Sequence, residues 1–394
     1  MLFVFNVYSS LLLPLVLQGI IFSLLLCWRS WTEDRLADRL LALILLLLTL
    51  RPVNWMLGFA HWYDTKDWHT TFMYYFPWNY FLAYGPLAYL YFQSLTNRDF
   101  SLRRRDLWHF LPLGLDKTHD LIIILREVVV EHLIQGQPFS GDGGSRGELI
   151  ETGYWMISDL VQIGGVISVF GYFGWILWQY RQYRAYVSAQ FSDTGSLMLS
   201  WLRNFLIAFL LTQVISTGFT IANLVSVKGL TYIEQWYSYF AWGLIIYYVS
   251  IAGYQAHIRG LEVLRFEVAA PPPEPPPAVS GPAPSPLIGQ IRTYMETERP
   301  YLIPGLTLAQ LAAQLHLPQA ELSRAINETG QHFNDFVNQY RIEAVKQALT
   351  DPRRQHLSLL GVALDCGFNS KATFNRVFRQ FTGVAPGAYR DAQT

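Results

Sequence analysis

The sequence predicts an all-α protein: a seven-helix transmembrane bundle followed by a C-terminal, all-helical domain with two helix-turn-helix units. Three observations lead to this prediction. Hydrophobic residues make up 52% of the 394 residues and charged residues only 15%, a balance typical of membrane proteins. Long apolar runs recur before residue 256. After a proline-rich stretch, the rest of the chain carries a helix-turn-helix pattern twice.

The second of these patterns lies in residues 358–381. Gly367 supplies the backbone freedom that a helix C-terminus requires, and Asn369 or Ser370 can cap the helix that follows. Large apolar residues recur on one face of that helix: Phe374, Val377, Phe378 and Phe381. The opposite face and its flanks carry small, polar and basic residues: Lys371, Ala372, Thr373, Asn375, Arg376 and Arg379. Such a helix suits the major groove of DNA, although an ordinary solvated helix has the same pattern.

A unit of the same shape lies upstream, in residues 306–330. Its second helix turns Leu322, Ala325 and Ile326 inward. Its outward face is formed by Ala320, Ser323, Arg324 and Asn327. One longer helix, about 332–349, joins the two units. This repetition favours DNA binding, with the outward residues of both second helices as the expected contacts.

The two-unit arrangement resembles the AraC/XylS family of transcription regulators, over about 85 residues. The matching positions are Leu308, Leu311, Ala312, Leu322, Ser323, Arg324, Gly330, Phe333, Phe336, Tyr340, Arg341, Ala344, Ala363, Gly367, Phe368, Asn369, Ser370, Phe374, Asn375, Arg376, Phe378, Gly383, Pro386, Tyr389 and Arg390. The resemblance implies a double helix-turn-helix domain that binds double-stranded DNA. It places Arg324 and Arg376 at positions similar to base-contacting sites of the family.

Seven membrane spans are expected, at about 9–28, 40–60, 77–94, 107–130, 155–180, 199–222 and 233–255. Basic clusters follow the first, third, fifth and seventh spans, which favours an outside N-terminus and a cytoplasmic C-terminal domain. The span at 107–130 is required by this charge order, because its own apolar run is poor. Six helices with a re-entrant fourth segment is the alternative.

Four polar residues interrupt the fourth span: Asp116, Lys117, His119 and Asp120. Charges at bilayer depth are costly and generally face a cavity or a partner, so they could form a polar pocket that senses a ligand or protons. Alternatively, the helix ends early and these residues lie in the outer headgroup region. The two interpretations stay open.

Three domains are therefore predicted: a sensor and anchor domain in residues 1–268, a proline-rich linker in 269–286, and the AraC-type domain in 287–394. Polyproline II is the default conformation of such a linker. The two cysteines, Cys27 and Cys366, fall in different domains, so no disulfide framework is expected.

No catalytic motif, metal-binding pattern or cofactor motif is recognisable, so we expect neither an enzyme nor a cofactor. The predicted function is that of a membrane-bound, one-component transcription regulator in the bacterial inner membrane. The alternative is a transporter- or receptor-like protein whose last domain binds a protein. Expected partners are DNA, the lipid bilayer and an unidentified small-molecule or membrane signal, with RNA polymerase and a second copy of the chain also considered. We further hypothesise that the membrane domain supplies dimerisation, because the linker is too irregular to transmit a helix rotation.

Overall fold

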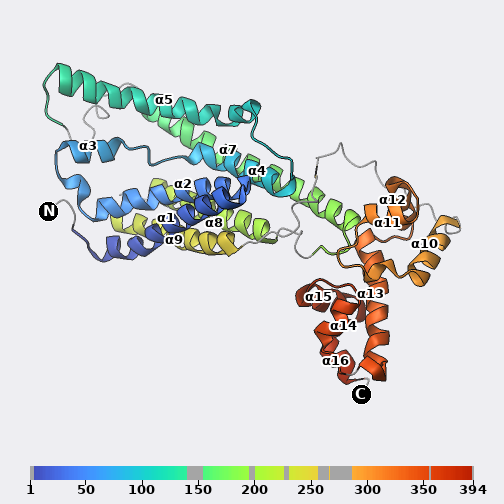
Figure 1. The fold of residues 1–394 in the computed structure, drawn as a ribbon. Coiled ribbons are helices and arrows are strands. Elements are labelled where there is room, and N and C mark those ends of the chain that lie inside the picture. The colour runs from blue at the N-terminus through green and yellow to red at the C-terminus, as the bar shows by residue number, and fades with distance from the viewer. Residues whose placement is uncertain are drawn as a thin grey trace. The chain divides into compact units, whose positions relative to one another are not determined.

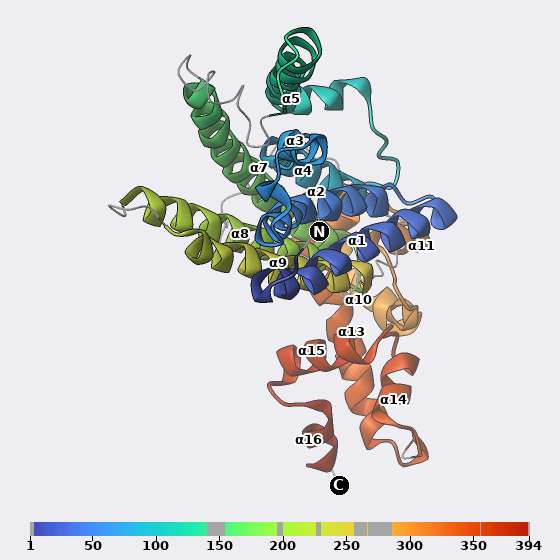
Figure 2. The same cartoon turned by 90° about the vertical axis from the view of Figure 1, so that its left-hand side faces the viewer.

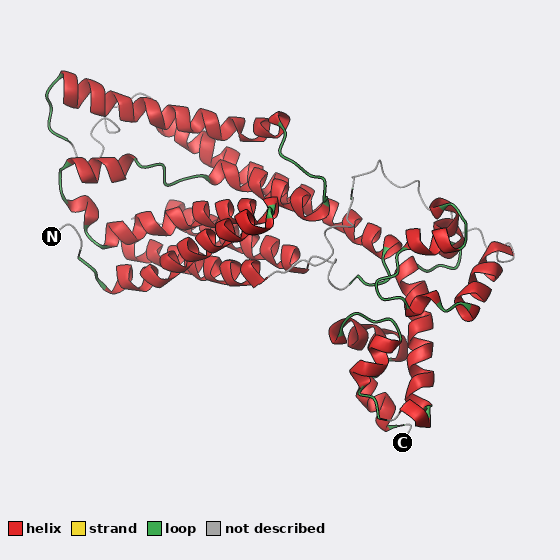
Figure 3. Ribbon diagram, viewed as in Figure 1, coloured by secondary structure: helices red, strands yellow, loops and turns green. Residues whose placement is uncertain are grey.

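The computed structural model of the protein describes residues 4–139, 154–194, 200–225, 230–255, 266, 286–354 and 356–392. Within these residues the chain is helical and forms no β-strand, as Figure 3 shows, so the predicted all-α class is confirmed for them. The chain divides into two compact units (Figure 1). The first contains residues 1–177 and 200–257, and the second contains residues 178–199 and 258–394.

Four long helices lie side by side in the first unit, as Figures 1 and 2 show: α1 (Val7–Glu33), α2 (Leu36–Phe59), α8 (Ser200–Val225) and α9 (Tyr232–Gln255). Gly19 of α1 allows close packing there. A Cβ atom at this position would overlap the hydroxyl of Thr49 on α2 and lie 3.2 Å from Ile246 Cγ2 on α9. Small residues at such crossings let apolar helices approach closely in a membrane environment.

The other elements of the first unit are η1 (Trp62–Asp64), α3 (Trp68–Tyr75), α4 (Phe81–Thr96), the 3₁₀ segment η2 (Arg104–Phe110), α5 (Leu111–Leu125) and the π-helix η3 (Arg126–Ile134). Helix α7 (Tyr154–Gln190) begins in the first unit and ends in the second. It continues about ten residues beyond the end predicted from the apolar run. The predicted span ended before Arg181 and Arg184, but both arginines lie within the helix.

Each of the seven expected spans overlaps a helix. Three helical segments are long and apolar enough to cross a bilayer: Val7–Glu33, Leu36–Phe59 and Ser200–Asn223. Helices α4 and α5 have only 16 and 15 residues, which is short for a spanning helix. The predicted transmembrane character is thus supported for these three segments of the described chain.

The second unit contains the helices α10 (Pro286–Thr297), α11 (Leu308–Gln314), α12 (Gln319–Asn327), α13 (Phe333–Thr350), α14 (Leu359–Asp365), α15 (Lys371–Thr382) and α16 (Pro386–Asp391). Two hydrophobic cores stabilise it. Phe336 and Val337 of α13 belong to the first core, with α10, α11 and α12. Ile342 and Val345 of α13 belong to the second, with α14 and α15. Helix α13 therefore joins two helix-turn-helix units, as the sequence predicted. The proline-rich linker lies outside the described residues except for Pro286.

Cys366 is a probe of the second core. It is 2% exposed, and burial raises the pKa of its thiol to about 11. At pH 8, roughly one such thiol in a thousand is ionised, and the thiolate is the reactive form. We expect Cys366 in the folded protein to resist alkylation by iodoacetamide at pH 8 and to react readily in denaturant, as measured by mass spectrometry of its peptide. A surface cysteine, introduced as Gln347→Cys, should react without denaturant. Equal labelling of the two sites in the folded protein would contradict this packing.

Candidate nucleic-acid interface

Helices α11 and α12 form the first helix-turn-helix unit. Helix α11 begins with a capping box: the hydroxyl of Thr307 accepts a hydrogen bond from the Gln310 amide at 3.2 Å, and the Gln310 side chain accepts one from the Thr307 amide at 3.0 Å. The chain reverses at His316, which has a φ of 55°. Leu311 and Leu322, one from each helix, are fully buried in the shared core. The orientation of α12 is thereby set by its apolar face.

The opposite face of α12 carries the four residues predicted from this unit. Ala320, Arg324 and Asn327 are exposed, and Ser323 is half-buried. They occupy one side of a nine-residue helix whose other side is buried through Leu322, Ala325 and Ile326. The predicted division of this helix into inward and outward faces is thus what the structure has.

Helices α14 and α15 form the second helix-turn-helix unit. The turn between them passes through Gly367, whose φ of 87° lies in the left-handed region. A Cβ atom there would collide with the backbone carbonyl oxygen of Tyr301, so this turn packs directly against the loop that precedes the first helix-turn-helix unit. Ser370 caps α15, because its hydroxyl accepts a hydrogen bond from the Thr373 amide at 3.2 Å. Gly383 ends the helix with a φ of 76°.

The residues predicted on the outward face of α15 divide into two groups. Five are exposed: Lys371, Ala372, Asn375, Arg376 and Arg379. Thr373 is only 7% exposed, and its hydroxyl donates a hydrogen bond to Asp193 Oδ1 at 3.5 Å and accepts one from Ser370 Oγ at 3.0 Å. Thr373 was placed on the flank of the face by helical spacing, but these contacts put it in the cap of the helix.

The basic residues on these two faces differ from three others in the same domain. Lys346, Arg354 and Arg390 each lie within 4.0 Å of a carboxylate. Among the described residues, no ion pair involves the basic residues of the two outward faces: Arg324, Lys371, Arg376 and Arg379. Their charges are therefore available to an anionic partner, which phosphate groups and guanine edges both suit.

The predicted sensing residues lie on α5 in the first unit. Lys117 Nζ is 2.9 Å from Asp116 and 2.8 Å from Asp120, and lies 5.4 Å from the centre of the Tyr80 ring. Lys117 is thus paired with two carboxylates, and α5 continues beyond these residues to Leu125, so the helix does not end at residues 116–120. The side chain of His119 lies outside the described part of the structure.

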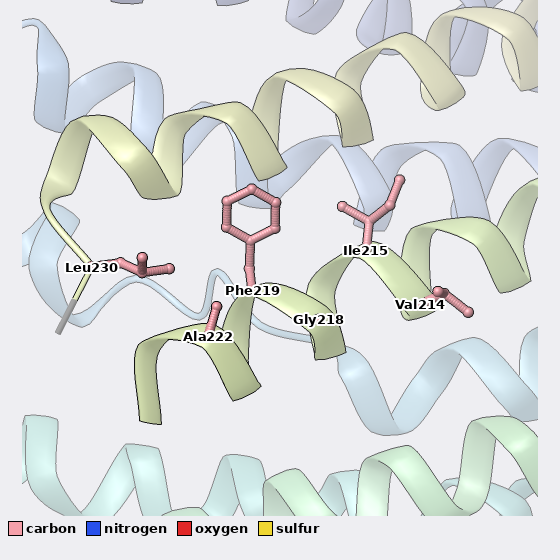
Figure 4. Close-up of a pocket in the computed structure, with 6 residues that line it drawn as sticks. All are labelled: Val214, Ile215, Gly218, Phe219, Ala222 and Leu230. Atoms are coloured by element: carbon pink, nitrogen blue, oxygen red, sulfur yellow. The ribbon is translucent and has the colours of Figure 1, made fainter. Parts of the chain in front are cut away.

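A cavity of about 320 Å³ in the first unit has a different lining, which Figure 4 shows: Val214, Ile215, Gly218, Phe219, Ala222 and Leu230. This lining is apolar and includes none of the predicted sensing residues. Among the described residues, no group of three or more His, Cys, Asp or Glu side chains could hold a metal ion.

Comparison with known proteins supports the identification of the two units. Residues 311–392 match a family model described as "Helix-turn-helix domain". An "Ornithine utilization regulator" of Pseudomonas aeruginosa is 34% identical over 85 residues, which are 22% of this chain and 24% of that protein. An "Uncharacterized HTH-type transcriptional regulator" of Staphylococcus aureus strain COL is 32% identical over 104 residues, which are 26% of this chain and 13% of that protein. The chain thus spans a quarter or less of these relatives.

A solved structure of a protein of unknown function from Listeria innocua is 28% identical and covers 28% of this chain and all of its own, with a TM-score of 0.25. That score is too low for a comparison of folds. The sequence matches fall on the two units just described, in proteins named as transcriptional regulators. The C-terminal part of the chain, residues 311–392, is a helix-turn-helix domain of the type that transcription regulators carry.

Proposed function

We propose that the protein is a membrane-bound, one-component transcription regulator of the AraC type, in which a membrane sensor controls a sequence-specific DNA-binding domain. One observation carries this proposal. Both second helices of the paired units present exposed arginines that have no carboxylate partner among the described residues. The bidentate guanidinium of arginine reads guanine in the major groove.

The outward residues of α12 and α15 are the proposed DNA contacts. Arg324 and Arg376 would read bases. Lys371, at the start of α15, would bind a backbone phosphate, which the N-terminal end of a helix also attracts. Thr373 would position α15 through its cap and would not read a base, because it is buried. Ala320, Ser323, Asn327, Ala372, Asn375 and Arg379 complete the proposed surface.

The first unit is the proposed membrane sensor, with seven spans, an outside N-terminus and a cytoplasmic C-terminal domain. Three helical segments long and apolar enough to cross a bilayer support this topology, together with the basic residues that follow the odd-numbered expected spans. Residues 287–394 contain eleven Lys or Arg and nine Asp or Glu, a net charge of only +2. Such a domain should bind DNA weakly at physiological salt, so dimerisation by the membrane part would strengthen binding.

The geometry of the domain predicts its footprint. Two helix-turn-helix units joined by the single helix α13 should enter successive major grooves on one face of DNA, about ten base pairs apart. The full-length protein in detergent micelles, bound to a promoter fragment recovered by crosslinking in cells, should protect an asymmetric site of two such grooves. Hydroxyl-radical footprinting checks this. Protection of a single groove would contradict the paired arrangement, and the absence of salt-dependent DNA binding would favour a protein partner instead.

A further inference from the structure

A short segment that follows α7 belongs to the same unit as the helix-turn-helix domain. After α7 ends at Gln190, the chain runs antiparallel to the loop that leads into α11. Phe191 and Thr307 form a β-bridge, and the Ser192 amide donates a hydrogen bond to the Leu306 carbonyl oxygen at 3.1 Å. Phe191 is 8% exposed. We call residues 190–194 the docking segment.

Ser192 is the centre of this contact and is fully buried. Its carbonyl oxygen accepts hydrogen bonds from the side-chain amides of Asn334 at 2.7 Å and Asn338 at 3.4 Å, both on α13. Its hydroxyl accepts one from Arg341 Nη2 at 3.1 Å. One residue of the docking segment thus satisfies three polar side chains on the helix that joins the two units.

Arg341 is a buried cation that this segment helps to compensate. Its side chain is 1% exposed, and burial lowers the pKa of the guanidinium to about 10. It donates hydrogen bonds to the carbonyl oxygens of Tyr301 at 2.8 Å and Ile303 at 3.0 Å. The negative charge that favours its protonated form comes from Asp193, in the docking segment. A buried cation is costly unless hydrogen bonds and charges compensate it, and the docking segment supplies both.

The docking segment also reaches the first turn of both second helices. The side chain of Gln190 accepts a hydrogen bond from Gln319 at the start of α12. Asp193 accepts one from Thr373 at the start of α15, at 3.5 Å. In helix-turn-helix proteins these N-terminal turns approach the DNA, and a helix N-terminus attracts phosphate. The carboxylate of Asp193 therefore lies beside the cap of α15, at the end of the helix that would approach DNA.

We propose that residues 190–194 are an intramolecular docking segment for the helix-turn-helix domain, held on α13 through Ser192, and that docking competes with DNA binding. The first half of this proposal stands on the contacts alone, and the second rests on the proposed function. The docking segment follows α7 without an intervening linker, so a movement of the end of α7 acts directly on the domain. The proline-rich linker then keeps the domain attached when the segment is released.

Crosslinking of the full-length protein in membranes tests docking by itself. Gln190→Cys and Gln319→Cys are introduced with Cys27→Ser, together with a protease site in the proline-rich linker. After treatment with a short bis-maleimide and cleavage, the two fragments should remain joined. The matched control replaces Gln319→Cys with Gln347→Cys, an exposed glutamine on α13 about 13 Å further along the helix than Asn338. Joining no more efficient than in this control overturns docking.

Ser192→Leu tests the competition, since a larger side chain has no room at this fully buried position. The change leaves every residue of the helix-turn-helix domain intact. Ser200→Leu, at an exposed position at the start of α8, is the control. If about nine-tenths of the parent is docked, Ser192→Leu should bind promoter DNA about tenfold more tightly, whereas the control should match the parent. Ser192→Leu should also lose the crosslink.

The outcomes separate the two proposals. A variant that loses the crosslink but binds DNA no better than the parent, or binds it less well, overturns the competition. If the parent, the control and Ser192→Leu all fail to bind any promoter fragment, the proposed function fails and the competition with it. The crosslinking result would still decide whether the segment docks.

Discussion

Arg376→Ala is expected to reduce the preference for the correct base by about 1–3 kcal/mol, which corresponds to roughly fivefold to 150-fold in relative affinity. Arg376 is exposed on the outward face of α15 and has no ion-pair partner in the described part of the chain. An arginine paired with guanine O6 and N7 makes two hydrogen bonds that no other base offers in that arrangement. Arg324→Ala on α12 should have the same effect at the other half of the site.

Binding of the purified full-length variants to a library of mutated promoter sites measures this effect. Each variant should lose selectivity in one groove only, while its affinity for unrelated DNA changes little, because most non-specific binding depends on phosphate contacts. Arg292→Ala removes an exposed arginine of α10, outside both helix-turn-helix units, and should leave selectivity unchanged. If Arg324→Ala and Arg376→Ala discriminate among sites as well as the parent does, the proposed base contacts are wrong.

Gly367→Ala is expected to lower the free energy of unfolding of the helix-turn-helix domain by about 2–4 kcal/mol. The φ of 87° at this position is unfavourable for a residue with a side chain. The added Cβ would also collide with the Tyr301 carbonyl oxygen and lie 3.1 Å from Arg341 Nε. The collision is with a backbone atom that Arg341 already holds by a hydrogen bond, so the loop cannot easily move aside.

The alkylation rate of Cys366 reports this loss, since the thiol is buried in the core next to Gly367 and becomes accessible only when that core opens. The rate, measured at increasing denaturant concentration, should rise at a lower concentration in Gly367→Ala than in the parent. Gly387→Ala is the control, because nothing lies within 4 Å of its added Cβ and the residue belongs to helix α16. An equal response of the two variants would rule out a special role for the turn at Gly367.

Much of the fold and of the candidate interface could be predicted from the sequence, because the deciding interactions are local. Helix α15 is an example. The spacing of Phe374, Val377 and Phe378 determines which face is buried, and Ser370 supplies the cap within the same stretch of chain. The exposure of Arg324 and Arg376 follows from the same periodicity. The two units and the helix between them are therefore where the sequence predicted them.

Tertiary contacts decided what periodicity could not. Helical spacing places Thr373 beside the basic face, but hydrogen bonds to Ser370 and to the distant Asp193 remove it from that face. In the sequence the charges on α5 interrupt an apolar span, and only the structure shows that Lys117 pairs with both Asp116 and Asp120.

The docking segment is the clearest case. Ser192 and Arg341 are 149 positions apart, and a serine after an amphipathic helix carries no pattern that points to a partner. The amino-acid pattern by itself determined that the chain has an apolar helical part and a double helix-turn-helix domain. That α7 delivers a segment which completes the environment of a buried arginine was decided by the tertiary structure alone, because the interaction depends on hydrogen bonds between residues that only folding brings together.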